Sequence, residues 1–165
     1  HTSTLTTTYT VASSVDGVVS YANTTINPDG VTYGPYTTTS RLDATGALVS
    51  MDRTETSVNL PATFSVGTTW TVEPADPTTG LGAVIATVAA FDVARTVPAG
   101  TFTDCLQLNM TQSSTTGGTS VTVNYTDYLS PTAGTVVEST GTFSATNGFG
   151  YSYTSLLQPN YIANP

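Results

Sequence analysis

The chain has 165 residues, a net charge of −8 at neutral pH and only 8% charged side chains. This length is typical of one domain, and a hydrophobic content of 38% is ample material for a core. The basic residues are Arg41, Arg53 and Arg95, and the sequence contains no lysine. These features exclude a lysine-containing phosphate-binding loop, a Schiff-base enzyme, and a basic surface for nucleic acid or anionic lipid.

Side chains alternate with a period of two along most of the chain, and helical periodicity is nearly absent. Threonine makes up about one residue in five, which favours strands because its side chain is β-branched. Turn signals such as Asp16-Gly17, Gly117-Gly118 and Asn147-Gly148 separate the alternating runs. We therefore predict an all-β fold of about ten mostly antiparallel strands, at 3–13, 17–26, 31–42, 47–58, 67–73, 82–94, 101–112, 119–130, 134–145 and 149–157.

We expect residues 1–157 to form a single β domain, built as a curved sheet, a half-barrel or a sandwich. The segment 73–80 contains two prolines, so it cannot donate a full ladder of hydrogen bonds and is predicted to be a loop. This loop can divide the domain into halves, 1–72 and 81–157. Residues 158–165 are predicted to form a loosely held C-terminal tail.

Two motifs resemble those of known proteins. Residues 60–70 have the form Leu-Pro…Val-Gly-Thr-x-Trp, and residues 97–105 read Val-Pro-Ala-Gly-Thr-Phe-Thr-Asp-Cys. Their order resembles that in a loose group of uncharacterised exported bacterial β-proteins, whose sheet is often a half-barrel like that of lipoprotein carriers. The resemblance covers residues 58–140. It implies a bacterial envelope or extracellular setting, and it brings no substrate and no active-site residue.

The second motif also has a purely structural explanation. Pro98 cannot donate to a ladder, and Gly100 can take a positive φ, so we expect a sharp turn into the next strand. Strict alternation would then place Asp104 on one face with Phe102 and Leu106. Two arrangements remain open: an uninterrupted strand, or a bulge near Asp104 that moves Cys105 inward. Because Cys105 is the only cysteine, no internal disulfide can form, and we expect its thiol to be buried.

The sequence gives little support for catalysis. His1 is the only histidine, so neither a zinc ligand set nor a Ser-His-Asp or Cys-His nucleophile system can be assembled convincingly. Asp16, Asp29 and Asp76 stand beside Gly or Pro in predicted turns, where a capping role is usual. We predict no enzyme activity, no catalytic residue, no metal site and no cofactor.

Two functional hypotheses remain. The first is a structural protein, secreted or on a bacterial cell surface, that self-associates into an oligomer or filament. Its assembly strand would present Leu5, Thr7, Tyr9 and Val11, since residues 3–11 lack the charges and prolines that usually block edge pairing. Pairing of this strand within its own chain is equally open. No nucleic-acid partner and no membrane insertion are expected.

The alternative is a half-barrel binding module for an apolar or glycan ligand. Tyrosine suits half-wet surfaces, where the ring packs and the hydroxyl forms hydrogen bonds. The late strands supply three candidate ligand-facing residues, Tyr125, Tyr151 and Tyr153.

Overall fold

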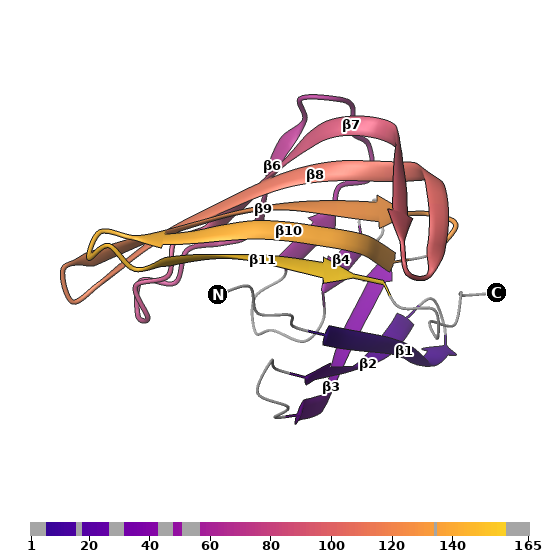
Figure 1. Ribbon diagram of the computed structural model, residues 1–165, viewed down its shortest axis with the longest axis horizontal. Helices are drawn as coiled ribbons and strands as arrows, with labels where there is room; N and C mark the ends of the chain where they lie inside the picture. The colour runs from indigo at the N-terminus through magenta and orange to yellow at the C-terminus, as the bar shows by residue number, and fades with distance from the viewer. Residues whose placement is uncertain are drawn as a thin grey trace.

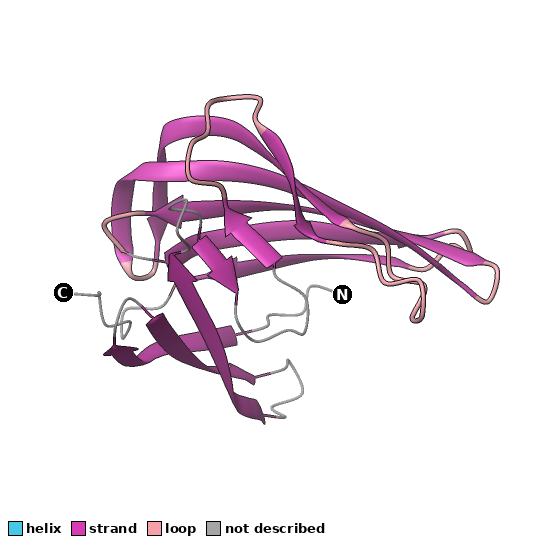
Figure 2. Cartoon of the chain, turned by 180° about the vertical axis from the view of Figure 1, so that it is seen from behind, coloured by secondary structure: helices cyan, strands magenta, loops and turns pink. Residues whose placement is uncertain are grey.

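The computed structural model describes residues 6–15, 18–26, 32–42, 48–50, 57–133 and 135–157, and these are all-β with no helix. They form two antiparallel sheets (Figures 1 and 2). The first sheet has the order β1-β2-β3-β4-β5, and the second has the order β11-β10-β9-β8-β7-β6. The strands are β1 (Thr6–Val15), β2 (Val18–Ile26), β3 (Thr32–Leu42), β4 (Leu48–Ser50), β5 (Ser57–Leu60), β6 (Thr69–Glu73), β7 (Val84–Val97), β8 (Gly100–Thr116), β9 (Thr119–Ser130), β10 (Thr135–Ala145) and β11 (Gly150–Leu156).

The strand count differs from the predicted ten in one place. The segment expected as one strand over 47–58 contains two short strands, β4 and β5, which pair with each other. The predicted tail, 158–165, lies outside the described residues. The assignment of residues 1–157 to one domain stays a prediction.

The second sheet contains the longest strands and is open, with β11 and β6 at its two edges. It arches over the first sheet, and the β8–β9 and β10–β11 hairpins extend beyond it (Figure 1). Tight turns make these hairpins because their glycines take a positive φ: 59° at Gly117, 80° at Gly118 and 86° at Gly148. The predicted turn signals at these positions are confirmed.

The β7–β8 hairpin bends back over the sheet instead of continuing its plane (Figure 1). Its register shifts between Ala90 and Val93, where Asp92 takes a φ of 54°, a conformation that aspartate tolerates better than most residues. The hairpin then closes at Pro98-Ala99, with Val97 paired to Gly100, whose φ is 140°. The predicted sharp turn at this motif is confirmed.

The sheet therefore has an apolar cluster on each side. On one face, Val88, Leu106 and Leu108 pack against Leu60 and Phe64; we call this the inner face. On the other, the outer face, the bent hairpin covers part of the sheet and forms a second cluster. Its members come from the hairpin, β9, β10 and the loop before β10, and are Val97, Phe102, Cys105, Tyr128, Ala133 and Val137.

A bulge in β8 explains how one strand serves both clusters. Val93 pairs with Cys105 and Arg95 pairs with Phe102, so β8 has one extra residue at 103–104. Of the two arrangements that the sequence leaves open, the structure has the bulge near Asp104, and Cys105 is fully buried. Phe102 joins Cys105 in the hairpin cluster, whereas Leu106 lies in the inner cluster, so the shared face expected for Phe102 and Leu106 is wrong.

Candidate functional site

The predicted assembly strand forms within the chain. Thr7, Tyr9 and Val11 lie in β1, which pairs with β2, and Leu5 lies outside the described residues. Thr7 is opposite Thr25, Tyr9 is opposite Asn23, and Val11 is opposite Tyr21. β1 is the edge of its sheet, since β2 is its only hydrogen-bonded neighbour among the described strands. β1 therefore pairs within its own chain along one of its two edges, which is the alternative to assembly that the sequence left open.

The predicted ligand-facing residues Tyr125, Tyr151 and Tyr153 share the inner face of the second sheet. Gly141 of β10 stands between Tyr125 of β9 and Tyr153 of β11 in one cross-strand row. Tyr125 and Tyr153 are half-buried, whereas Tyr151 is 53% exposed. The sheet thus brings the three tyrosines to one face, and Tyr151 alone is open to solvent.

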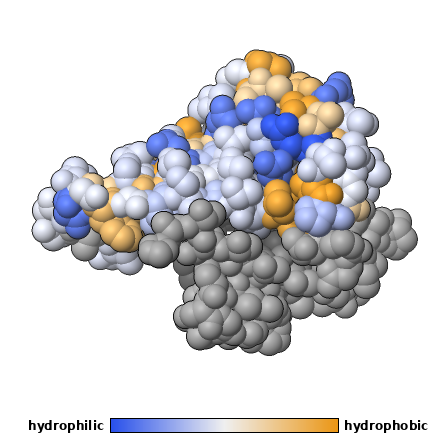
Figure 3. Space-filling view, viewed as in Figure 1, coloured by the Kyte–Doolittle hydropathy of each residue, from blue (hydrophilic) through white to orange (hydrophobic). Residues whose placement is uncertain are grey.

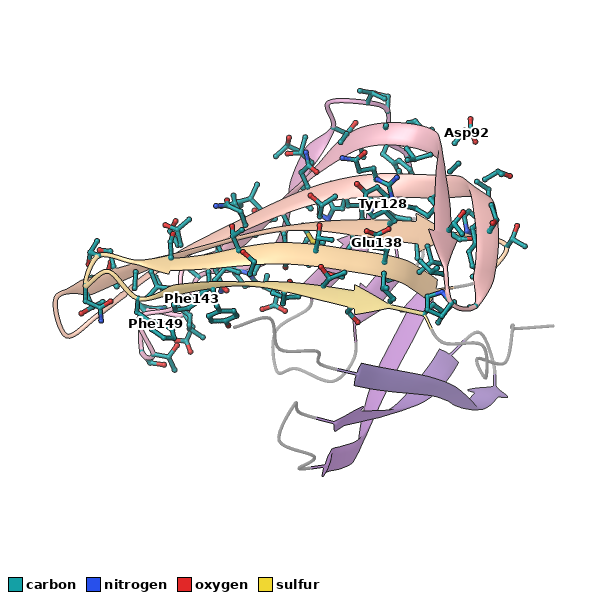
Figure 4. All side chains as sticks on the ribbon, viewed as in Figure 1. Asp92, Tyr128, Glu138, Phe143 and Phe149 are labelled. Carbon is teal, nitrogen blue, oxygen red and sulfur yellow. The ribbon has the colours of Figure 1, made fainter. Side chains whose placement is uncertain are left out.

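Tyr151 belongs to an exposed cluster that sequence analysis did not include. Its ring stacks on Phe143 with centroids 5.0 Å apart, and Phe149 meets both rings edge-on at 5.8 and 6.0 Å. Phe149 is 61% exposed. We call Phe143, Phe149 and Tyr151 the aromatic cluster; it lies at the extended end of β10 and β11 (Figure 4). Exposed aromatic clusters of this kind commonly mark binding surfaces.

A buried carboxylate accompanies the tyrosines. Burial raises the pKa of Asp127, and a hydrogen bond with Ser139 offsets only part of this effect. Its Oδ1 is buried without a hydrogen-bond partner. Burial, with a smaller contribution from Asp127, raises the pKa of Tyr125 to about 12. Burial therefore disfavours the charged form of both groups, which suits an apolar surrounding better than ionic chemistry.

The outer face is built from rows of short uncharged side chains that cross the strands. In one row, threonine or asparagine occupies every position of the second sheet, in the order Thr69, Thr87, Asn109, Thr126, Thr140 and Thr154. Two residues further along each strand lies a parallel row of Thr71, Ile85, Thr111, Asn124, Thr142 and Ser152. In Figure 3 the extended part of the molecule is mostly pale, and clear hydrophilic and hydrophobic patches lie at the opposite end.

A shallow groove of about 650 Å³ runs between these two rows from β7 to β11. The rows form its walls, and the intervening residues Met110, Tyr125, Gly141 and Tyr153 complete its lining. The side chains of Tyr125 and Tyr153 point to the inner face, and side chains alternate along each strand. Their threonine, serine and asparagine neighbours therefore point to the outer face and form the walls of the groove. The lining contains no ionisable group except these two tyrosines.

Several wall side chains are already ordered by hydrogen bonds. Thr126 Oγ1 donates to Asn109 Oδ1 at 3.1 Å, and Gln107 Nε2 donates to the same oxygen at 3.3 Å. Thr69 and Thr87 share a hydrogen bond between their hydroxyls at 3.0 Å. Because Asn109 Oδ1 accepts both hydrogen bonds, Asn109 Nδ2 remains as the donor of this side-chain amide.

A second polar cluster lies on the outer face beneath the bent hairpin (Figure 4). The Arg95 guanidinium lies 3.5 Å from the centroid of the Tyr128 ring, and its Nε is 3.3 Å from Glu138 Oε2. The Nε geometry does not meet the requirements of a hydrogen bond, so this contact is mainly electrostatic. Arg95 and Glu138 are 27% and 21% exposed. The cluster attaches the hairpin to β9 and β10.

The other described carboxylates with strong contacts have structural roles. Asp104 accepts hydrogen bonds from Ser130 Oγ at 2.7 Å and from the Thr132 backbone N–H at 2.9 Å. Hydrogen bonds from Thr132 and Ser130 lower the pKa of Asp104 to about 2. Asp76 accepts from Thr78 and Thr79 within its loop, the capping role expected for a turn aspartate.

Among the described residues, no group of three or more His, Cys, Asp or Glu side chains is placed to hold a metal ion. No helix in this part of the chain is long and apolar enough to cross a membrane. The second sheet thus offers a ligand or partner two kinds of contact. The outer face supplies neutral hydrogen-bonding groups, and the aromatic cluster supplies apolar contacts.

No family model matches the chain, and no curated protein or solved structure matches it either. The resemblance to exported bacterial β-proteins stays a prediction. The fold and the two surfaces define an all-β protein with an open sheet that carries a neutral groove and an aromatic edge.

Proposed function

We propose that this protein is a non-enzymatic structural subunit, secreted or located on a bacterial cell surface, that self-associates through the edges of its sheets. The observation that carries the proposal is the combination of an open strand edge and exposed aromatic side chains at β11. The proposed setting rests on the lysine-free, threonine-rich composition and on the resemblance of residues 58–140. The arched, open second sheet is also compatible with the half-barrel shape that the resemblance implies.

The edge at β11 lacks the usual features that prevent association. Residues 150–156 contain no charged residue and no proline, whereas edge strands of monomeric proteins are normally blocked by lysine, proline, a bulge or an inward-pointing charge. β11 has β10 on one side and no hydrogen-bonded neighbour on the other among the described strands. The backbone groups at the Gly150 end of this strand are therefore open to pairing with another strand.

The side chains near this edge favour a partner. Phe149 and Tyr151 expose more than half of their surface, and Leu156 exposes 37%. A strand added beside β11 would cover part of this apolar area while it pairs the open backbone groups. Backbone pairing and apolar burial thus act together at one edge.

The second open edge is β1, whose residues 6–15 are also uncharged and free of proline. The C-terminal end of β11 approaches β1 in the same molecule, whereas its Gly150 end extends past the first sheet (Figure 1). We propose that this extended part of β11 accepts β1 of a second copy. A contact between two different edges is heterologous, so it produces a chain of copies unless rotation closes a ring.

Sedimentation velocity over a range of concentrations tests the proposal. We expect the unmodified protein to exceed the monomer mass, with further growth beyond the dimer as concentration rises. Tyr151→Lys should shift assembly to at least tenfold higher concentration, because it adds a charge at the aromatic cluster of the edge strand. Ser113→Lys is the matched control: it adds the same charge on the outer face of β8, a central strand, and should assemble like the unmodified protein.

The outcomes separate the parts of the proposal. Monomers at all concentrations would overturn self-association. Equal assembly of Tyr151→Lys and the unmodified protein would overturn the role of β11. Growth that stops at a dimer would overturn the filament, because it indicates a closed contact between identical edges. Circular dichroism of each variant verifies that the β-sheet signal is retained.

A further inference from the structure

We infer that the groove on the outer face binds a neutral polyhydroxylated chain, such as an oligosaccharide, across strands β7 to β11. This inference goes beyond the proposed self-association and does not depend on it, because the groove and the aromatic cluster occupy opposite faces of the sheet.

Charge is the first argument for this class of ligand. The whole chain carries a net charge of −8, yet the groove lining contains no carboxylate and no basic side chain. An anionic or cationic ligand would lose its hydration there without gaining a charged partner. A neutral polyhydroxylated ligand also loses water, but the hydroxyl and amide groups of the lining can replace its hydrogen bonds, so the groove favours it over ions.

Hydrogen-bonding capacity is the second argument. Threonine and serine hydroxyls and asparagine amides both donate and accept, as do the hydroxyls of a sugar. The hydrogen bonds from Thr126 and Gln107 engage Asn109 Oδ1 and leave Nδ2 as a donor for a ligand. The threonine methyl groups and Ile85 supply apolar contacts that match the C–H faces of a sugar ring.

The repeat of the sheet is the third argument. Neighbouring strands lie roughly 4.8 Å apart, so one wall presents a polar group on each of five strands over roughly 20 Å. The other wall presents a polar group on four strands and Ile85 on β7. A chain of repeating units that lies across the strands can use the same contact several times. The volume of about 650 Å³ is in the range of small-molecule sites.

The two rows of side chains favour a single chain over a flat lattice. The groove between them is shallow, and its rows can flank a chain on two sides, whereas ice or a crystalline polymer surface needs a plane of contacts. The arch of the second sheet also prevents one flat contact plane across all its strands (Figure 1).

Affinity gel electrophoresis with soluble polysaccharides provides the test, with the Tyr151→Lys variant as the background so that assembly does not affect migration. The neutral probes are laminarin, dextran, xyloglucan and mannan, and the anionic probe is polygalacturonate. We expect retardation by at least one neutral polymer and none by the anionic one. The double variant Asn124→Ala/Thr142→Ala should weaken the retardation at least tenfold, because both residues belong to one wall of the groove.

Thr103→Ala is the matched control, since Thr103 is an exposed strand threonine outside the groove and its replacement should leave retardation unchanged. No retardation by any neutral polymer would overturn the inference. Equal binding by the double variant would place the ligand elsewhere, and preferential binding of polygalacturonate would overturn the ligand class. Adsorption to ice or crystalline cellulose without binding of soluble chains would assign the face to a flat lattice.

Discussion

The ring of Tyr153 on β11 lies across Gly141, its partner on β10, in the space that a side chain at position 141 would occupy. A Cβ atom placed on Gly141 would lie 2.6 Å from Cζ of Tyr153 and 2.8 Å from its hydroxyl oxygen. The absence of a side chain therefore lets the tyrosine lie flat on the sheet, where it is half-buried. An aromatic ring that covers a cross-strand glycine stabilises a position that otherwise lacks packing.

We therefore expect Gly141→Ala to lower the free energy of unfolding by about 1–2 kcal/mol, because the new methyl group must displace the ring. In a Tyr153→Ala background the same change should be neutral or stabilising, since alanine restricts the unfolded chain more than glycine does. Urea unfolding of the four proteins in this double-mutant cycle measures the coupling. Equal effects of Gly141→Ala in both backgrounds would contradict the contact.

Asp104 should make stability depend on pH in the acidic range. Its pKa is about 2 in the folded protein, below the ordinary value of 3.8. A lowered folded pKa gives stability that is present above pH 3.8 and is lost as the pH falls through 3.8 toward 2. Asp104→Asn should be less stable than the unmodified protein at neutral pH, and the difference should shrink across this window. Urea unfolding between pH 2 and pH 6 measures it, and a constant difference would be evidence against the prediction.

Asp127 should act in the opposite direction. Its folded pKa is raised, chiefly by burial, so ionisation costs more in the folded protein than in the unfolded chain. Asp127→Asn removes this ionisation and should stabilise the protein at pH 7. The gain should fall as the pH decreases toward the ordinary value of 3.8, where the unfolded carboxyl also becomes protonated. The same unfolding series checks this result, and a loss of stability at pH 7 would contradict it.

The contact between Arg95 and Tyr128 should depend on the planar guanidinium. Arg95→Lys keeps the positive charge near Glu138 but removes the plane that stacks on the ring. We expect a cost of about 1 kcal/mol, since cation–π contacts at partly exposed sites are of this size. Thermal unfolding measures the change. If Arg95→Lys is as stable as the unmodified protein whereas Arg95→Met is not, charge rather than stacking controls the contact.

Cys105 should be unreactive in the folded protein. Its side chain is fully buried, and burial raises the pKa of its thiol, with a smaller contribution from Asp104. Reaction with a disulfide reagent such as 5,5′-dithiobis(2-nitrobenzoate) should therefore occur only after unfolding. The protein in guanidinium chloride provides the control for a reactive thiol. Rapid labelling without denaturant would show that the hairpin cluster opens readily.

The alternation of side chains within single strands was readable from the sequence. Period two along segments such as 121–125 predicted strands, and Gly117-Gly118 and Pro98-Ala99-Gly100 predicted the turns between them, because these signals depend on neighbours in the chain. The sequence does not decide between a bulge at 103–104 and an uninterrupted strand, since either can accommodate Asp104. It also does not predict the two strands within 47–58.

The groove could not be predicted because no segment contains it. Thr87, Asn109, Thr126, Thr140 and Thr154 come from five strands, and they form a row only because the register of each hairpin aligns them. A shift of one residue in any strand would send its threonine to the inner face. The sequence by itself determined an acidic, all-β protein with few charged side chains, whereas tertiary pairing decided which faces became a groove and an aromatic edge.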